Sequence, residues 1–197
     1  MKIDFDKGDG LVPAIIQDAD TLQVLMLGYM NKDALRATRD SGFVTFWSRS
    51  RQCLWQKGET SGNRLKLESL NVDCDGDTLL IKARPAGPTC HTGTISCFGP
   101  EGPEGAGVLA ALGRVIEVRR TANPEGSYTA KLLQGPLTKA AQKVGEEGVE
   151  TVIAALAESN ERLACEAADL LYHLLVLLAA RNMSLSDVIV ELQRRRH

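Results

Sequence analysis

The chain has 197 residues, of which 44% are hydrophobic and 24% are charged, a composition typical of a globular protein with one large domain or two small ones. Its net charge of −2 argues against the basic surface that nucleic acids require, so no nucleic-acid partner is expected. The three arginines at positions 194–196 are instead typical of a solvated helix end.

No targeting or membrane-spanning segment is predicted. The first ten residues, MKIDFDKGDG, lack the apolar segment of a signal peptide, and the apolar run at 170–180 is too short to cross a bilayer. We therefore expect a cytoplasmic protein with no membrane partner, in which thiols stay reduced. Five cysteines, an odd number, fit metal binding better than a disulfide framework. Cys53 and Cys165 lie outside any ligand pattern and are predicted to be packing residues.

The first half of the chain has the pattern of strands and turns. Apolar or alternating runs of strand length occupy residues 12–17, 22–27, 43–47, 65–72 and 78–83. One helix is predicted over residues 32–40, with Asn31 as its N-cap and Gly42 just past its end. These features indicate a compact, mostly antiparallel β domain of the α+β class.

The character of the chain changes at residues 99–107, GPEGPEGAG, which are typical of a linker. Beyond it, apolar residues follow a helical period in four segments. These segments are 109–119, 137–158, 161–180 and 185–195, with 126–135 as a connection. Ser184 and Asp187 resemble a capping box for the last segment. We expect an all-α second half, with domains at 1–106 and 107–197.

Three aspartates alternate with other residues directly after the fourth predicted strand. If this segment were an extended strand, Asp73, Asp75 and Asp77 would share one face and Cys74 would point to the other. Oxygen ligands of this kind suit Mg²⁺. A calcium-binding EF-hand loop is excluded, because its sixth position is not glycine and its twelfth is not glutamate. The aspartates alone leave a solvated acidic turn equally open.

Three cysteines in the same region add a second kind of metal ligand. Cys74, Cys90 and Cys97 offer thiolates, which favour Zn²⁺, and three protein ligands with an open fourth position are typical of catalytic zinc. Such zinc lowers the pKa of a water molecule toward about 7. The alternative is that these cysteines are small buried hydrophobic residues. His91 could be a ligand, a base or a hydrogen-bond donor.

Several motifs of the first half together resemble the phosphoribosyl-AMP cyclohydrolases of histidine biosynthesis. They are SRSR at 48–51, WQKGETSG at 55–62, DCDGD at 73–77, GPTCHTG at 87–93 and SCF at 96–98, within residues 8–98. The resemblance implies that the aspartates bind Mg²⁺ and that the cysteines bind one Zn²⁺ per site. It also implies a homodimer whose zinc ligands come from both chains. In the implied reaction, zinc-activated water attacks C6 of the substrate's adenine and the N1–C6 bond opens.

Other residues of these motifs are candidates for handling the substrate. His91 and Lys57 are the candidate catalytic residues of this half. Arg49, Arg51 and Lys57 are also candidate phosphate contacts because of their charge and turn context, although each could equally be a surface charge. The polar turn at 59–62 could present backbone N–H groups to an anion.

Four carboxylates recur with helical spacing in the second half. Glu147 and Glu150 are three residues apart on one predicted helix, and Glu166 and Asp169 are three apart on the next. Each pair therefore lies on one helical face, and antiparallel helices could bring the pairs together around Mg²⁺. A solvated acidic face is the alternative. It is disfavoured because apolar residues crowd both helices and an unpaired charge at Asp169 would be costly.

This pattern of carboxylates resembles the all-α nucleoside triphosphate pyrophosphohydrolases. The neighbouring motifs SYTAKL at 127–132 and QKVGEE at 142–147 look like phosphoribosyl-ATP pyrophosphohydrolase in particular, over about residues 109–195. The resemblance implies that the four carboxylates bind Mg²⁺ and that Glu146 supports them or helps to activate water. Candidate phosphate contacts are Lys131, Lys139 and Lys143.

Together the two resemblances imply a fused, bifunctional enzyme of histidine biosynthesis acting on small nucleotide substrates. Two alternatives stay open at this point. One is a nucleotide-pool house-cleaning pyrophosphohydrolase fused to a structural zinc module. The other is a non-catalytic, zinc-stabilised binding module.

Overall fold

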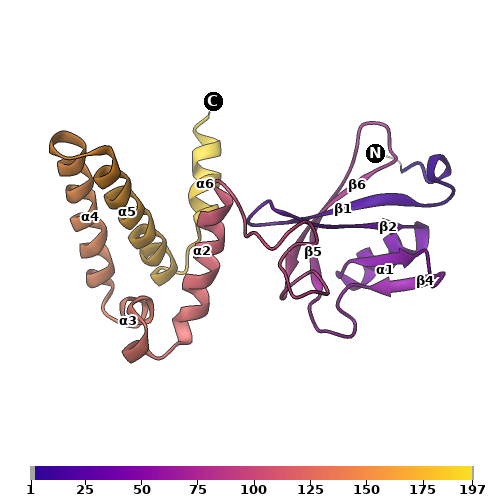
Figure 1. Cartoon of the computed structure of the whole chain (residues 1–197), viewed down its shortest axis with the longest axis horizontal. Helices are drawn as coiled ribbons and strands as arrows, with labels where there is room; N and C mark the ends of the chain where they lie inside the picture. Colours follow the sequence, from indigo (N-terminus) through magenta and orange to yellow (C-terminus); the bar gives the residue numbers. More distant parts are fainter. Residues whose placement is uncertain (1–2, 197) are drawn as a thin grey trace. The chain divides into compact units, whose positions relative to one another are not determined.

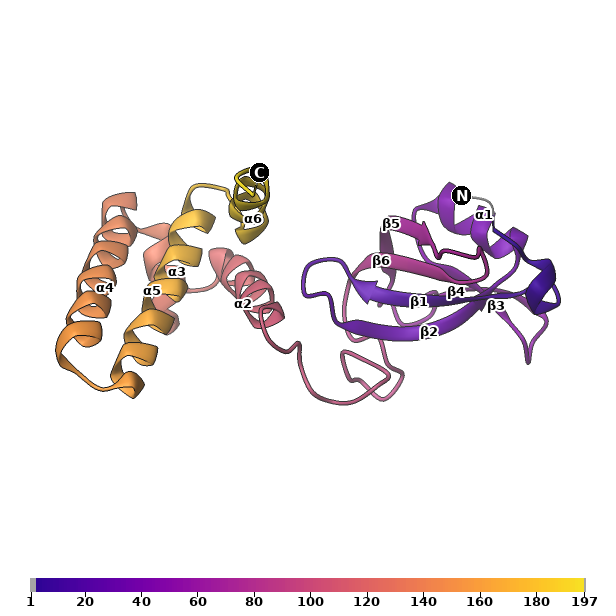
Figure 2. The same cartoon turned by 90° about the horizontal axis from the view of Figure 1, so that it is seen from above.

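The computed structural model describes residues 3–196 (Figures 1 and 2). The chain forms two compact units, the first ending at Val108 and the second beginning at Leu109. The first unit is built around β-strands and the second is helical, as the sequence predicts.

The first unit contains a four-stranded sheet in the order β2-β1-β6-β5. Its strands are β1 (Val12–Asp18), β2 (Val24–Met30), β5 (Leu65–Val72) and β6 (Leu79–Pro85). The β1–β2 and β5–β6 pairs are antiparallel, whereas β1 and β6 are parallel. Alternate residues of β1 are buried, with Val12, Ala14 and Ile16 fully inaccessible. The mostly antiparallel prediction is therefore confirmed, with one parallel pair at the centre.

Helix α1 (Lys32–Ser41) has the ends that the sequence predicts. The Asn31 side chain accepts a hydrogen bond from the backbone N–H of Ala34 at 2.8 Å. Gly42 ends the helix with a φ of 72°, a left-handed conformation that favours glycine. A short 3-10 helix, η1 (Asp6–Gly8), precedes β1.

A second, two-stranded sheet joins β3 (Thr45–Ser48) to β4 (Cys53–Gln56). The sequence predicts β3 but misses β4, because its four residues are too few to show an alternating pattern. Phe46 of β3 and Trp55 of β4 pack with their ring centroids 5.8 Å apart. Phe46 also presses on Gly28 of β2, where an added Cβ would lie 2.3 Å from the ring. Only glycine fits this close approach of the two sheets.

The second unit contains five α-helices in its described residues. They are α2 (Gly107–Val118), α3 (Tyr128–Gln134), α4 (Leu137–Ala157), α5 (Asn160–Ala180) and α6 (Leu185–Arg194), with the 3-10 turns η2 (Arg119–Thr121) and η3 (Pro124–Gly126). The connection predicted at 126–135 is wrong, because most of it forms α3. Ser127 caps this helix by accepting a hydrogen bond from Ala130 N–H at 3.2 Å. Seven residues between two glycines are too few to show a helical period.

The capping arrangement predicted for the last helix is present. The backbone N–H of Ser184 donates a 2.7 Å hydrogen bond to the carboxylate of Asp187. This is the reciprocal bond of a capping box, and it fixes the start of α6.

The hydrophobic core of the second unit lies around the later turns of α5. Leu175, Val176 and Ala179 of α5 pack with Ile116 of α2 and Leu132 of α3. Helices α4 and α5 run side by side beyond this core (Figure 1). Helix α4 leaves much of its apolar surface uncovered: Val149, Val152, Ile153 and Leu156 are all at least half exposed.

Helix α5 has the length and composition of a membrane-crossing helix, which the shorter run at 170–180 did not indicate. It also carries Glu166 and His173, both buried among the neighbouring helices. Two buried ionisable side chains are better explained by a central helix of a helical bundle than by contact with lipid.

Candidate active sites

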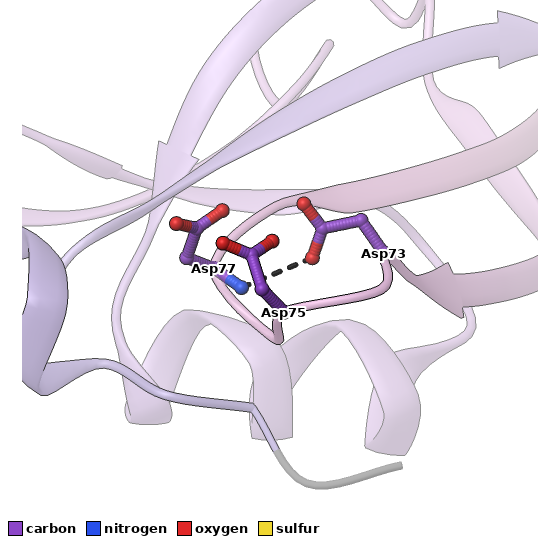
Figure 3. A group of neighbouring side chains, drawn as sticks. All are labelled: Asp73, Asp75 and Asp77. Carbon is purple, nitrogen blue, oxygen red and sulfur yellow. Dashed lines mark hydrogen bonds between the residues drawn. The ribbon is translucent and has the colours of Figure 1, made fainter.

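The three aspartates lie in the turn between β5 and β6, so the alternative of an extended strand, with Cys74 on the opposite face, does not apply (Figure 3). Asp73 Oδ1 accepts hydrogen bonds from the backbone N–H groups of Gly76, Asp77 and Thr78 at 3.0, 3.0 and 3.1 Å. Gly76 has a φ of 84°, which allows the turn to be this tight. The turn brings one carboxylate oxygen from each of Asp73, Asp75 and Asp77 within 4.8 Å of one another.

A lysine from η1 reaches this cluster of aspartates. Lys7 Nζ lies 2.8 Å from Asp75 Oδ2 and 3.4 Å from Asp77 Oδ2, and it donates to the Asp75 carbonyl at 3.1 Å. The hydrogen bond from Lys7 holds the pKa of the Asp75 carboxyl below its usual range. The cluster therefore already attracts a positive charge, which here is supplied by the protein.

Cys90 and Cys97 lie in the loop that follows β6, and their thiols interact. Thr92 Oγ1 donates a 3.1 Å hydrogen bond to Cys90 Sγ, and this bond is the main cause that lowers the pKa of Cys90 to about 6. Burial instead raises the pKa of Cys97. The Cys97 backbone is fixed by a 2.8 Å hydrogen bond to Leu25 O of β2. Cys90 is thus largely ionised at neutral pH, the form in which cysteine binds metal.

The third cysteine of the predicted zinc set does not join these two within one chain. Cys74 is exposed in the aspartate turn, and among the described residues it forms no ligand group with Cys90 and Cys97. Cys53 and Cys165 are also exposed, so their prediction as packing residues is wrong.

His91 and Lys57 lie beside the same pair of thiols. The exposed His91 places Nδ1 3.8 Å from Cys90 Sγ. The positive charge of Lys57 acts on Cys97 and opposes the effect of burial on the pKa of that thiol. Both candidate catalytic residues of this half therefore face the cysteine loop.

The basic candidates of the first half surround aromatic rings that sequence reasoning missed. The Arg51 guanidinium and the Lys57 ammonium lie 5.7 and 6.0 Å from the centre of the Trp55 ring. Arg49 lies 3.9 Å from the centre of the Tyr29 ring. Cations held against aromatic faces form a surface suited to phosphates and bases together. The signal for Trp55 was its place between the basic residues Arg51 and Lys57, whereas Tyr29 lies far from Arg49 in the sequence.

In the second unit, three of the four predicted carboxylates come together. Glu147 and Glu150 of α4 and Glu166 of α5 each offer an oxygen within 4.8 Å of the others. Glu147 and Glu166 are buried, whereas Glu150 is exposed. Asp169 is exposed and stays outside this group in the described structure, so the expectation that its charge would be costly is wrong.

Basic side chains lie around these carboxylates. Arg162 pairs with Glu166. Lys143 Nζ lies 2.8 Å from Glu146 Oε2 and 3.7 Å from Glu147 Oε1. The hydrogen bond from Lys143 holds the pKa of Glu146 below its usual range, so this carboxyl is ionised at neutral pH.

The other two lysines predicted to contact phosphate lie farther from the carboxylates. Lys139 Nζ donates a 3.5 Å hydrogen bond to Gln142, whose amide donates in turn to Glu146 at 2.6 Å. Lys131 is exposed on α3. The structure therefore brings Lys143 to the carboxylates directly and links Lys139 to them through one side chain.

Sequence reasoning missed a histidine and two tyrosines beside the carboxylates. His173 of α5 is buried, with Nε2 3.5 Å from Glu147 Oε1. Its ring contacts those of Tyr172 and Tyr128 edge-on, at centroid distances of 4.9 and 5.9 Å. The signal was present in the spacing, because His173 follows Glu166 by two helical turns and so lies on the same face.

Comparison with known proteins gives a consistent result along the chain. Residues 26–99 match the family model for phosphoribosyl-AMP cyclohydrolase, and residues 109–196 match that for phosphoribosyl-ATP pyrophosphohydrolase. Three curated relatives carry the name histidine biosynthesis bifunctional protein HisIE. The protein from Xanthomonas campestris pv. campestris is 54% identical and the match covers 98% of this chain and 92% of that protein. Those from Bacteroides thetaiotaomicron and Campylobacter jejuni are 54% and 55% identical, covering 99% and 98% of this chain and 96% and 94% of theirs.

Proposed function

The chain belongs to the family of bifunctional phosphoribosyl-AMP cyclohydrolases and phosphoribosyl-ATP pyrophosphohydrolases, and from this premise we propose which residues carry each reaction. It is a hydrolase of histidine biosynthesis. One half releases pyrophosphate from phosphoribosyl-ATP, and the other opens the adenine ring of the resulting phosphoribosyl-AMP. We assign ring opening to residues 1–106 and pyrophosphate release to 107–197, joined by the linker at 99–107. The ranges of the two family matches support this division.

In the second half, Glu147, Glu150 and Glu166 hold Mg²⁺, and Asp169 joins them from the next turn of α5. The convergence of the first three within 4.8 Å is the observation that carries this assignment. Carboxylate oxygens fit Mg²⁺, which neutralises phosphate charge when it is bound. Clustered buried carboxylates without a cation would repel one another, and Arg162 and Lys143 balance only part of that charge.

The remaining polar residues of this half position the reactants. The ionised Glu146 accepts a hydrogen bond from the attacking water and so orients it toward phosphorus. Water adds across the bond between the α- and β-phosphates, which leaves phosphoribosyl-AMP and pyrophosphate. Lys143 and Lys139, which lie one turn apart on α4, bind phosphate oxygens. Lys131 of α3 does the same.

In the first half, Cys74, Cys90 and Cys97 hold one Zn²⁺ per site, and the three aspartates hold Mg²⁺. The donor sets fit these ions, because thiolates favour zinc and carboxylates favour magnesium. The low pKa of Cys90 supplies a thiolate at neutral pH, and Lys7 already places a positive charge at the aspartates. Zinc held by three thiolates supplies a water of lowered pKa, near 7.

The other candidates of the first half hold the substrate. Arg49 and Arg51 bind its phosphates, and the Trp55 ring stacks on a base. Lys57 and His91, both beside the thiols, move protons during ring opening. Water adds at C6, the N1–C6 bond breaks, and N1 takes up a proton.

We propose a homodimer in the cytoplasm. The three cysteines do not converge within one chain, which supports a zinc site completed by the partner's thiols. The exposed apolar face of α4 supports a second contact between copies, because Val149, Val152, Ile153 and Leu156 would otherwise face water. The five free cysteines also fit the cytoplasm, whose reducing conditions keep thiols available as ligands.

A coupled assay tests this function. The purified chain is supplied with phosphoribosyl-ATP, and pyrophosphate and the ring-opened product are measured over time. We expect pyrophosphate first, then phosphoribosyl-AMP as a transient, then the ring-opened product. Faster hydrolysis of ordinary or damaged nucleoside triphosphates than of phosphoribosyl-ATP would favour the house-cleaning alternative instead.

A further inference from the structure

His173 is a buried ionisable residue in the second half to which the functions proposed above give no role. Only 6% of its surface is exposed, and its Nδ1 is buried without a hydrogen-bond partner in the described structure. Its other ring nitrogen, Nε2, faces Glu147 Oε1 at 3.5 Å. A polar ring placed in the interior with one nitrogen unsatisfied costs stability, and a residue that served packing alone would avoid this cost.

The surrounding side chains hold the His173 ring in one orientation. Tyr172 and Tyr128 contact it edge-on from two sides, and Tyr172 is itself fixed by a 2.8 Å hydrogen bond between its hydroxyl and that of Thr129. A ring confined in this way keeps Nε2 directed at Glu147. The arrangement therefore orients the glutamate rather than merely filling space.

The two nitrogens indicate which of them carries the proton. A proton on Nδ1 would be buried without an acceptor, whereas a proton on Nε2 faces a carboxylate oxygen. The ring is therefore placed to donate from Nε2 toward Glu147.

We propose that His173 is a positioning residue for pyrophosphate release. Its Nε2 faces Oε1 of Glu147 at 3.5 Å, and a small shift of either side chain completes a hydrogen bond; Lys143 approaches the same oxygen at 3.7 Å. The second oxygen of Glu147 is thereby presented to the cation together with Glu150 and Glu166. Hydrogen-bond donors of this kind fix the orientation of a metal ligand and strengthen metal binding. The inference rests on the proposed metal site of the second half.

Substitutions of His173 in the full-length chain separate this role from packing. Glutamine places an amide N–H near the position of Nε2, asparagine is too short to reach it, and leucine fills the space without a donor. Leu171→Met is the matched control, because it changes an exposed apolar side chain of the same helix and leaves the ring and its neighbours in place. Mn²⁺ replaces Mg²⁺ as a spectroscopic probe of binding. Asp73→Asn, Asp75→Asn and Asp77→Asn in the background confine this signal to the second half.

We expect His173→Leu and His173→Asn to raise the Mn²⁺ concentration at half-saturation by about 10- to 100-fold. His173→Gln should stay within about threefold of the parent, as should Leu171→Met. In a chain with the native aspartates, ring opening should be unaffected by all four changes, and the helical circular dichroism signal and its thermal unfolding should match the parent, which shows that the second half is folded. If the His173→Leu protein does not fold, the difference in Mn²⁺ binding between His173→Gln and His173→Asn decides.

A residue that only packs gives the opposite order, because leucine fits an apolar space better than an amide does. The proposal is overturned if the His173→Leu protein binds Mn²⁺ as tightly as the parent. It is also overturned if the His173→Gln protein binds Mn²⁺ as weakly as the His173→Asn protein. Glu147→Gln distinguishes a failure of the proposed metal site from a failure of the positioning role. If it leaves Mn²⁺ binding intact, the metal site itself is wrong. If it abolishes binding while His173→Leu does not weaken it, only the positioning role is wrong.

Discussion

Both halves of the chain gather three carboxylates within 4.8 Å, but they do so by opposite means. The aspartates are neighbours in the sequence, and their turn is held by backbone N–H groups bound to Asp73. The glutamates come from two helices and meet only because α4 and α5 pack side by side. Asp75 is exposed and Asp73 and Asp77 are half-buried, whereas Glu147 and Glu166 are buried.

The two clusters also differ in how their negative charge is balanced. In the turn, Lys7 approaches from η1 through solvent-exposed contacts that water and salt weaken. Between the helices, the ion pairs with Arg162 and Lys143 involve buried carboxylates, where a missing partner costs more. We therefore expect changes in the helical cluster to have the larger effects.

The largest effect should come from Glu166→Gln, which removes one charge from the helical cluster and keeps the side-chain size. Pyrophosphate release should fall by about 100-fold or more, because the cation that balances the phosphates loses a ligand. Ring opening of supplied phosphoribosyl-AMP should be unchanged. Cys97→Ala should give the reverse pattern. A folded variant of either kind that loses both activities would contradict the division into two independent sites.

Metal removal should separate the two kinds of donor. After treatment with EDTA, added Mg²⁺ should restore pyrophosphate release at once, because carboxylate sites exchange this ion easily. Ring opening should also need Zn²⁺, which thiolates hold tightly. The measurement is each activity against added metal, with zinc content checked by atomic absorption. Recovery of ring opening by Mg²⁺ alone, in protein verified to be zinc-free, would rule out the zinc assignment.

A smaller effect should follow from the hydrogen bond between Thr92 and Cys90. Because the pKa of Cys90 is lowered to about 6, its thiolate is present above that pH and is lost as the pH falls through it. In zinc-free protein, alkylation of Cys90 should therefore have a midpoint near 6. Thr92→Val should move the midpoint upward and slow alkylation at pH 7 several-fold. An unchanged midpoint would show that Thr92 does not stabilise the thiolate.

The smallest effect should come from Lys7→Ala. Removing an ammonium that occupies the aspartate turn should tighten Mn²⁺ binding there a few-fold, because the ion no longer competes with a bound charge. Lys66→Ala, at an exposed lysine of β5, is the control for the general change in net charge. The comparison is made in a Glu147→Gln background, so that the binding signal comes from the turn. Equal effects of the two substitutions would mean that Lys7 has no specific role at the turn.

The features of the fold and the sites that the sequence predicts are those set by local spacing. The aspartate turn, the capped ends of α1 and the long helices follow from neighbouring residues, as do the carboxylate pairs on α4 and α5. Other features depend on tertiary packing. Strand β4 is too short to show an alternating pattern, and α3 is too short to show a period. The spacing on α5 places His173 on the same face as Glu166, but its contact with Glu147 joins two helices and depends on how they pack.

The same limit applies to the cysteines. Their residue types indicate zinc, but Cys74 is held by the aspartate turn and the other two by the loop after β6. Nothing in the sequence fixes the distance between these segments. In the structure the three do not converge within one chain, which contrasts with the three converging glutamates.

Subunit mixing tests this contrast most directly. Cys74→Ala and Cys90→Ala proteins should each be inactive in ring opening, and their mixed dimers should contain one site with both lesions and one intact site. About half of randomly paired dimers are mixed, so ring opening should recover to roughly a quarter of wild type. The matched pair, Glu147→Ala and Glu166→Ala, should recover no pyrophosphate release, because each helical site lies within one chain. The account is contradicted if the cysteine pair stays inactive after confirmed exchange, or if the glutamate pair recovers.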